Sequence, residues 1–254
     1  MRTGNPALSE NAFDREAGLS NDSSVMTIGG AIQKTAILTV LLVAAGAVSW
    51  TLVNDGGTAL ESPVKSFRLL FGLGAPLLGF AVAMLISFVP KTAPFASPVY
   101  AVLQGLFLGA ISSWMNAAYA GIAIEAALLT VGTLAVMLFL YASRWIVVTN
   151  KLRTGIIAAT GAVCLMYLAT FLLRLFGVNF PFLSGSGPVS IGISMLVVAV
   201  AAFNLVLDFD TIERGARARA PKYMEWYSAF GLLVTLVWLY LEILRLLAKL
   251  RGRD

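Results

Sequence analysis

Three carboxylates near the C-terminal end of the chain lie where acids are costly. Asp208 and Asp210 come directly after an uncharged run that ends at Leu207, and Glu242 lies inside a second apolar run, 230–247, that has no other acid. An ionisable group at membrane depth costs at least ~2.5–3.5 kcal/mol on insertion scales, and it normally faces the bundle interior with a partner. We therefore expect Asp208 and Glu242 to meet, and this acidic pair is the candidate functional centre.

Two carboxylates in contact have a characteristic chemistry. In a low-dielectric site they cannot both ionise easily, so they share a proton. Loss of that proton makes the two charges repel and creates a site for Ca²⁺, which prefers oxygen ligands. Such a pair could close a pore when protonated and open it when ionised. The alternative is a hydrogen-bonded pair that only fixes the last helix in the bundle, and the residues alone give the two interpretations equal weight.

The composition is that of an integral membrane protein. Of the 254 residues, 59% are hydrophobic and only 12% are charged, about half the charged fraction of soluble domains. There is one cysteine, Cys164, and no histidine, which excludes an intrachain disulfide, His or Cys metal clusters and Ser-His or Cys-His catalysis. We expect no enzyme and no resident cofactor. The net charge of +5 indicates basic loops beside anionic lipid rather than nucleic-acid binding.

The acids must be positioned by membrane-spanning helices. Seven apolar runs are each near the ~20 residues needed to cross a bilayer; they are 35–53, 69–89, 99–120, 122–143, 154–173, 188–207 and about 226–247. The sequence predicts an all-α membrane protein with a polar, mostly disordered tail (1–33), one seven-helix transmembrane domain (34–250) and a short basic C-terminal tail (251–254).

Basic residues in short loops predict the orientation. If the chain crosses at every run, the side that holds the N-terminus carries eleven Lys and Arg residues, Lys91 and Arg144 among them, and the other side carries seven. This favours a cytoplasmic N-terminus. The basic C-terminal tail then lies outside, unless the last run is a re-entrant hairpin.

Three features concern packing rather than chemistry. Gly105 and Gly109 have the spacing that lets helix backbones approach closely, and close packing is favoured over a pore-lining role. Tyr240 lies deep in the last run, and its hydroxyl needs an acceptor that we expect on a neighbouring helix. Glu125 lies near the membrane surface and is more typical of an interfacial residue than of a transport ligand.

The chain resembles a bacterial member of the Bax inhibitor-1 family. The resemblance rests on the seven-run pattern and on three segments: Pro98-Val99-Tyr100-Ala101 leading into Gly105 and Gly109, LDFDTI at 207–212, and LYLEIL at 239–244. It covers about residues 30–250. It implies six helices around a central seventh, and in some members a pH-sensitive calcium leak with a carboxylate pair from helices six and seven as proton sensor.

The resemblance also assigns residues. Asp208 matches the aspartate of helix six, Glu242 that of helix seven, and Asp210 lies beside them; Asp208 and Glu242 would be transient calcium ligands. Glu242 is one methylene longer than an aspartate, which changes the spacing of the pair. Lys91 is the nearest match to a basic residue that locks the helix-six aspartate, and a lysine would form a weaker lock than a bidentate arginine.

The expected function is therefore a pH-sensitive calcium leak of the bacterial inner membrane, with the lipid bilayer and calcium ions as its partners. The alternative is a non-conducting regulator, of the stress-response or cell-death-suppressor type, that binds a membrane protease or another membrane protein.

Asp208 and Glu242 can be in contact only if part of the last helical segment changes direction. Residues 219–229 must leave the axis of the last helix, because a straight helix from Met224 would set the two acids ~13 Å apart along the bundle.

Overall fold

The computed structural model describes residues 25–55, 72, 74–177 and 185–252. The first 24 residues of the predicted tail and residues 253–254 lie outside this part of the chain. The described residues form seven α-helices, α2 (Ile28–Asp55), α4 (Ala75–Phe88), α5 (Ala93–Ala118), α6 (Ile122–Ala142), α7 (Asn150–Leu175), α9 (Pro188–Arg217) and α10 (Met224–Arg251), with a short 3-10 helix, η3 (Pro90–Thr92), before α5. Six helical segments are long and apolar enough to cross a membrane, and the described part of α4 is shorter. The chain is an all-α membrane protein, as predicted.

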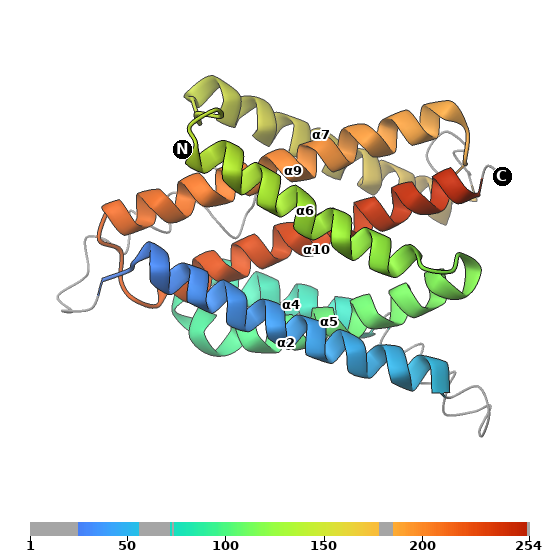
Figure 1. The fold of residues 1–254 in the computed structure, drawn as a ribbon, viewed down its shortest axis with the longest axis horizontal. Helices are drawn as coiled ribbons and strands as arrows, with labels where there is room; N and C mark the ends of the chain where they lie inside the picture. Colours follow the sequence, from blue (N-terminus) through green and yellow to red (C-terminus); the bar gives the residue numbers. More distant parts are fainter. Residues whose placement is uncertain (1–24, 56–71, 73, 178–184, 253–254) are drawn as a thin grey trace.

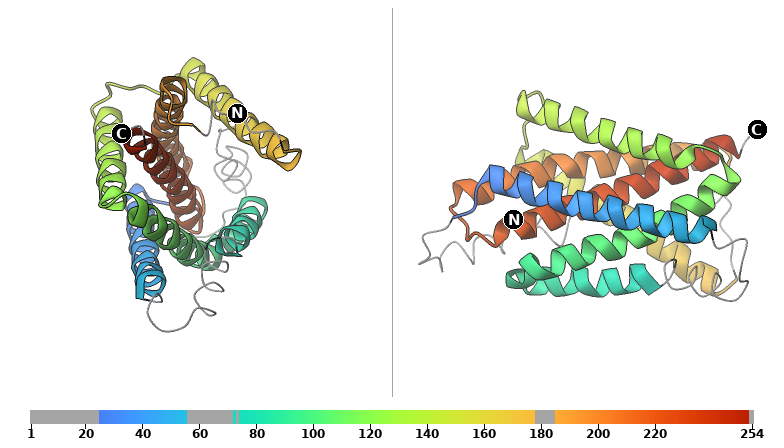
Figure 2. Two further views of the ribbon diagram at one scale, coloured as in Figure 1. Left: turned by 90° about the vertical axis from the view of Figure 1, so that its right-hand side faces the viewer. Right: turned by 60° about the horizontal axis from the view of Figure 1, so that its bottom comes forward.

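Helix α10 lies in the centre of the bundle. It packs against α9, α2, α6 and α5, and Figure 2 shows the other helices arranged around it. In its most apolar stretch 56% of the residues are buried, against 17% in α2 and in α7. The outer helices turn apolar side chains such as Leu128 (67% exposed) away from the protein, which suits a surface in contact with lipid.

The helix ends gather at two ends of the bundle (Figure 1). At the first, the backbone of Met26 donates to Ala220 O (2.7 Å), which joins the start of α2 to the α9–α10 connection. We call this the basic end; its described Lys and Arg residues include Lys91, Arg144, Lys151, Arg153, Arg214, Arg217, Arg219 and Lys222. At the opposite end, Arg251 donates to Ala120 O (2.6 Å), joining the end of α10 to the α5–α6 turn. The described helix ends therefore divide between the two ends of the bundle as the sequence predicts.

Helices α2 and α5 pack with their backbones in contact. A Cβ atom on Gly109 would overlap the backbone of Gly46, and one on Gly105 would overlap the carbonyl of Leu42. Only glycine allows this approach, so the predicted packing role of Gly105 and Gly109 is confirmed.

Helix α2 begins at Ile28, earlier than the apolar run that marked it in the sequence. The fully buried Glu225 explains the early start. Its carboxylate accepts hydrogen bonds from the backbone and the hydroxyl of Thr27 (both 3.0 Å) and forms an ion pair with Lys222 (2.9 Å). The expected boundary between the mostly disordered tail and the helical domain, after residue 33, therefore falls inside α2, because a distant acid caps the start of the helix.

The last helix also differs from its prediction. Helix α9 ends at Arg217, and α10 is one continuous helix from Met224. The short connection turns at Arg219, whose φ is 54°, and Pro221 cannot continue a helix hydrogen-bond pattern. The prediction that residues 219–229 leave the axis of the last helix is wrong from Met224 onward.

Candidate functional site

The register between α9 and α10 fixes the depth of each acid. Lys249 Nζ donates to Ser194 Oγ (2.8 Å) and to Ser190 O (3.3 Å). Counting along the two antiparallel helices from this contact, Asp208 lies level with about residue 233 of α10. Glu242 is nine residues farther along α10, so the two acids lie ~13 Å apart along the bundle at ~1.5 Å per residue.

Helix α7 gives an independent measure of the same offset. Thr160 lies level with Asn204 of α9, which donates to its hydroxyl (2.8 Å). Tyr167 is seven residues, or ~10 Å, from Thr160 toward the opposite end, and its hydroxyl donates to Glu242 (2.9 Å). Asp208 is four residues, or ~6 Å, from Asn204 toward the basic end. Both measures place the acids on different levels.

Asp208 and Glu242 therefore do not form the direct pair that the sequence predicts, and they cannot ligate one calcium ion together in this arrangement. The physical reason is the continuous α10, which carries Glu242 past the level of Asp208. Their separate roles as sensor and gate residues stay predictions.

Glu242 is held by donors from two helices. Only 2% of its side chain is exposed, and it forms an ion pair with Arg245 Nη1 (2.9 Å). The Tyr167 hydroxyl and Trp238 Nε1 (3.2 Å) also donate to the carboxylate, and the Arg245 guanidinium lies 4.9 Å from the centre of the Tyr167 ring. Charge-assisted hydrogen bonds of this kind are what a carboxylate at membrane depth needs.

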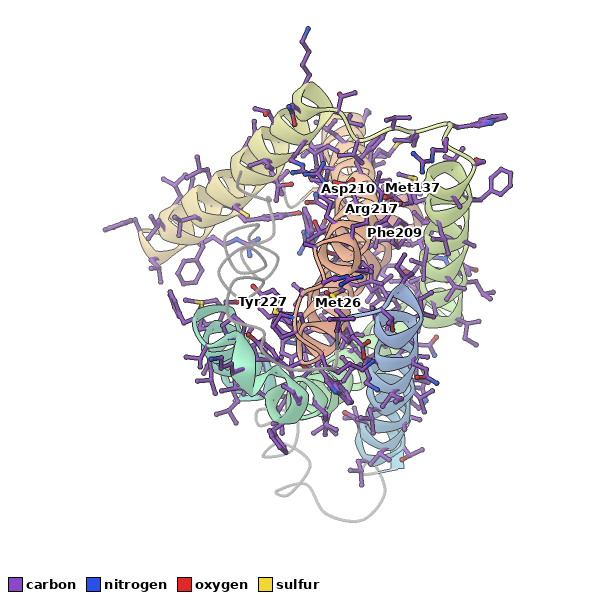
Figure 3. All side chains as sticks on the ribbon, turned by 90° about the vertical axis from the view of Figure 1, so that its left-hand side faces the viewer. Met26, Met137, Phe209, Asp210, Arg217 and Tyr227 are labelled. Atoms are coloured by element: carbon purple, nitrogen blue, oxygen red, sulfur yellow. The ribbon has the colours of Figure 1, made fainter. Side chains whose placement is uncertain are left out.

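The two aspartates lie nearer the basic end, where α9 ends at Arg217; Figure 3 labels Asp210 and Arg217. Asp208 is buried, with 1% of its surface exposed. Asp210 forms ion pairs with Arg153, whose side chain is 3% exposed, and with Arg214 Nε (3.0 Å). Lys91 is exposed at the same end of the bundle, and its role as a lock for Asp208 stays a prediction.

Further polar side chains lie at several depths of the bundle. Ser190, Ser194, Asn204, Asp208 and Thr211 are buried residues of α9 in two groups, 190–194 and 204–211, and within each group the spacing is three or four residues, as on one helix face. We define the polar column by its members from the opposite end to the basic end: Lys249 with Ser194, Glu242 with Tyr167 and Arg245, Asn204 with Thr160, Asp208, and Asp210 with Arg153.

Three of the five levels of the column carry a carboxylate: Glu242, Asp208 and Asp210. Within the described ranges, no group of three or more His, Cys, Asp or Glu side chains could hold a metal ion.

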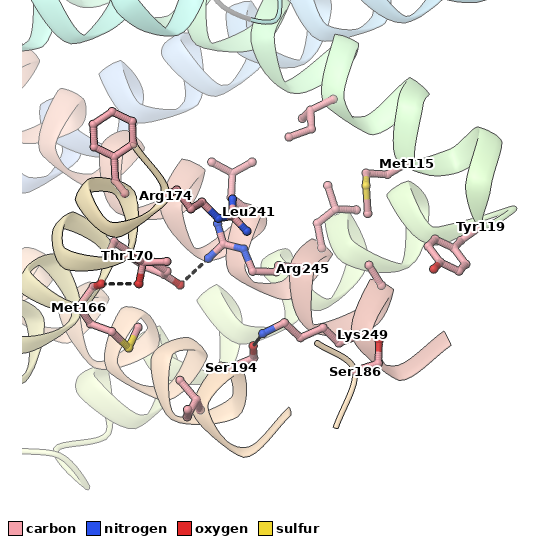
Figure 4. Close-up of a pocket in the computed structure, with 16 residues that line it drawn as sticks. Met115, Tyr119, Met166, Thr170, Arg174, Ser186, Ser194, Leu241, Arg245 and Lys249 are labelled. Atoms are coloured by element: carbon pink, nitrogen blue, oxygen red, sulfur yellow. Dashed lines mark hydrogen bonds between the residues drawn. The ribbon is translucent and has the colours of Figure 1, made fainter. Parts of the chain in front are cut away.

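A cavity of about 570 Å³ lies beside the column near the opposite end (Figure 4). Tyr167, Arg245, Lys249 and Ser194 belong both to its lining and to the column. The cavity therefore reaches the side chains that hold Glu242.

The sequence did not identify several partners in this site. Arg245 lies three residues from Glu242, a spacing that places two residues on one helix face and that could have shown the pair. Arg153 is 57 residues from Asp210 and Tyr167 is 75 from Glu242, so only the fold brings them together. The prediction that Tyr240 bonds a neighbouring helix is confirmed by Ser112 Oγ at 2.6 Å.

Comparison with known proteins gave one match. The family model described as Bax inhibitor 1 like matches residues 5–252, a range that includes every described helix. The comparisons with curated proteins and with solved structures gave no match.

Proposed function

The chain belongs to the Bax inhibitor-1-like family, and from this premise we propose that it is a pH-sensitive calcium leak. The single observation that best supports the proposal is the polar column, because ionisable side chains inside a membrane bundle are expensive and mark ion pathways. Calcium is the transported ion in this proposal, with no resident cofactor.

In the proposal each acid is a separate station, that is, a position at which the passing ion binds briefly. Ca²⁺ takes oxygen ligands, and passage requires binding that is strong enough to enter and weak enough to leave. Asp208 and Glu242, on levels ~13 Å apart, offer two such stations with the Asn204–Thr160 hydrogen bond between them. Arg245, whose side chain is 44% exposed, can turn toward the cavity when a cation replaces it at Glu242.

The response to pH follows from the charge of each station. A protonated carboxyl group carries no negative charge to attract a cation. We therefore propose that the leak falls as the pH falls, with each acid contributing on its own rather than through a shared proton. Lys91 is the proposed lock at the basic end.

The orientation is part of the proposal. The basic end carries most of the described loop cations, so the positive-inside rule places it, with the N-terminus, on the cytoplasmic side. We propose the bacterial inner membrane as the location.

Calcium flux into proteoliposomes between about pH 5 and about pH 8 tests the proposal. We expect wild-type flux above that of empty liposomes, rising with pH. Glu125→Gln serves as a control, since this acid is half-exposed and pairs with Arg251 at the end of the bundle, and its flux should match the wild type. A wild-type protein without flux above the empty liposomes would contradict the leak and favour the alternative, a non-conducting regulator of a membrane protease or another membrane partner.

A further inference from the structure

The charged side chains that line the cavity near the opposite end all have the same sign. Its described lining includes three charged residues, Arg174, Arg245 and Lys249, and all three are cationic. They come from α7 and α10 and gather around the cavity in Figure 4. Glu242, behind the wall, offsets one of these charges through its pair with Arg245. The cavity therefore keeps a positive balance.

Lys249 forms a built part of this wall. Its side chain is about nine-tenths buried (9% exposed), and its ammonium is positioned by Ser194 Oγ and Ser190 O. A lysine in this place is fixed by the helix packing of α9 and α10. It is not a mobile surface charge.

Arg245 can serve a second acceptor from where it lies. In the described part of the chain its contacts to Glu242 and Tyr167 all involve Nη1. A guanidinium carries five N–H donors in a planar fork that matches carboxylate and phosphate oxygens. Arg174 adds a second guanidinium at the cavity.

We propose that this cavity binds a phosphate group, with Lys249, Arg245 and Arg174 as its ligands. Arginine and lysine side chains bind phosphate through strong charge-assisted hydrogen bonds. The source is an anionic phospholipid headgroup or free phosphate. The apolar part of the lining, which includes Ile111, Phe171 and Leu241, suits acyl chains and favours the lipid. The site shares Arg245 with the proposed calcium leak, but phosphate binding does not require conduction.

Binding to the purified full-length protein tests the site. The probes are short-chain phosphatidylglycerol, phosphatidylcholine with the same acyl chains, and inorganic phosphate, each followed by native mass spectrometry and by the shift of the thermal-unfolding midpoint. We expect phosphatidylglycerol to bind the wild type, and Lys249→Met and Arg174→Gln each to weaken binding about tenfold or more, since each removes a charge-assisted hydrogen bond. Lys151→Met, an exposed lysine at the basic end, is the matched control and should bind like the wild type.

The other possible outcomes either identify the source of the phosphate or overturn the proposal. Binding of inorganic phosphate with the same sensitivity to both variants identifies free phosphate as the source; binding of phosphatidylglycerol alone identifies the lipid. Wild-type protein that binds neither probe, or variants that bind as well as the wild type and Lys151→Met, would overturn the proposal. Arg174→Gln changes an exposed side chain, so the test holds even if Lys249→Met does not fold.

Discussion

At the scale of single residues, the ion pair of Glu242 and Arg245 is unequal in its burial. The acid is 2% exposed and the arginine 44%. Loss of the arginine therefore leaves a carboxylate inside the bundle, whereas loss of a surface cation leaves its partner in water.

We predict that Arg245→Gln lowers the free energy of unfolding by ~1–3 kcal/mol, because a charged hydrogen bond to a buried group is lost while Tyr167 and Trp238 remain. The comparison change Arg251→Gln removes an ion pair with Glu125, which is 49% exposed, and a hydrogen bond to Ala120 O at the end of the bundle, and it should cost only ~0–1 kcal/mol. Denaturation of both variants in detergent measures the difference. Equal losses of unfolding free energy would show that water reaches Glu242 in the folded protein, which would contradict its burial.

A second residue-scale prediction concerns Tyr240 and Ser112. Their hydroxyls are hydrogen-bonded at 2.6 Å between α10 and α5. Tyr240→Phe should lower the free energy of unfolding by ~1 kcal/mol. In a double-mutant cycle with Ser112→Ala, the double variant should lose less than the sum of the two single losses. Additive losses would mean that the two hydroxyls do not interact.

The sequence located the acids but not their surroundings. Asp208, Asp210 and Glu242 stand out because an acid next to or inside an apolar run is rare. Arg153 and Tyr167 lie in an ordinary helix start and an ordinary apolar run, and nothing in their local sequence indicates a partner on α9 or α10. Their assignment requires the register between helices.

At the scale of elements, the α2–α5 contact depends on glycine. We predict that Gly109→Ala destabilises the protein by ~1–3 kcal/mol, since the added Cβ would overlap the backbone of Gly46 and overpacking costs about this much. Gly132→Ala in α6 is the control, because a Cβ there meets nothing within 4 Å and alanine favours a helix by ~1 kcal/mol. The free energy of unfolding of both variants tests this prediction. A Gly109→Ala protein as stable as the wild type would contradict the close α2–α5 packing.

Hydropathy predicted the apolar parts of the helices and missed their polar ends. The sixth run was predicted to end at Leu207, whereas α9 continues to Arg217. A helix keeps its hydrogen bonds after it leaves the apolar stretch, and Arg214 and Arg217 near its end favour the helix dipole. The predicted pairing of Asp208 with Glu242 is wrong for a different reason: α10 is continuous from Met224 and carries Glu242 past the level of Asp208.

At the scale of the whole molecule, the arrangement around α10 was predicted through the family resemblance, and the number and order of the described helices through hydropathy. The contact of residues 25–27 with the α9–α10 connection was not predicted, because the buried Glu225 lies in a segment that reads as an ordinary interfacial helix start.

The separation of the two ends predicts the outcome of cysteine labelling. In a Cys164→Ala background, Lys91→Cys should react with a membrane-impermeant reagent from the cytoplasmic side and Ser186→Cys from the other side. The two residues belong to different ends of the bundle, and the basic end faces the cytoplasm by the positive-inside rule. Reaction of both from one side would refute the topology.

The most direct test of the proposed leak compares four proteins in calcium-flux proteoliposomes between about pH 5 and about pH 8: wild type, Asp208→Asn, Glu242→Gln and the double variant. Sites more than ~7–10 Å apart generally act additively. We therefore predict that each single change removes part of the pH response and that the double variant loses the sum of the two parts. A wild type without calcium flux, or a double variant no different from either single variant, would contradict a leak with two separate acidic stations.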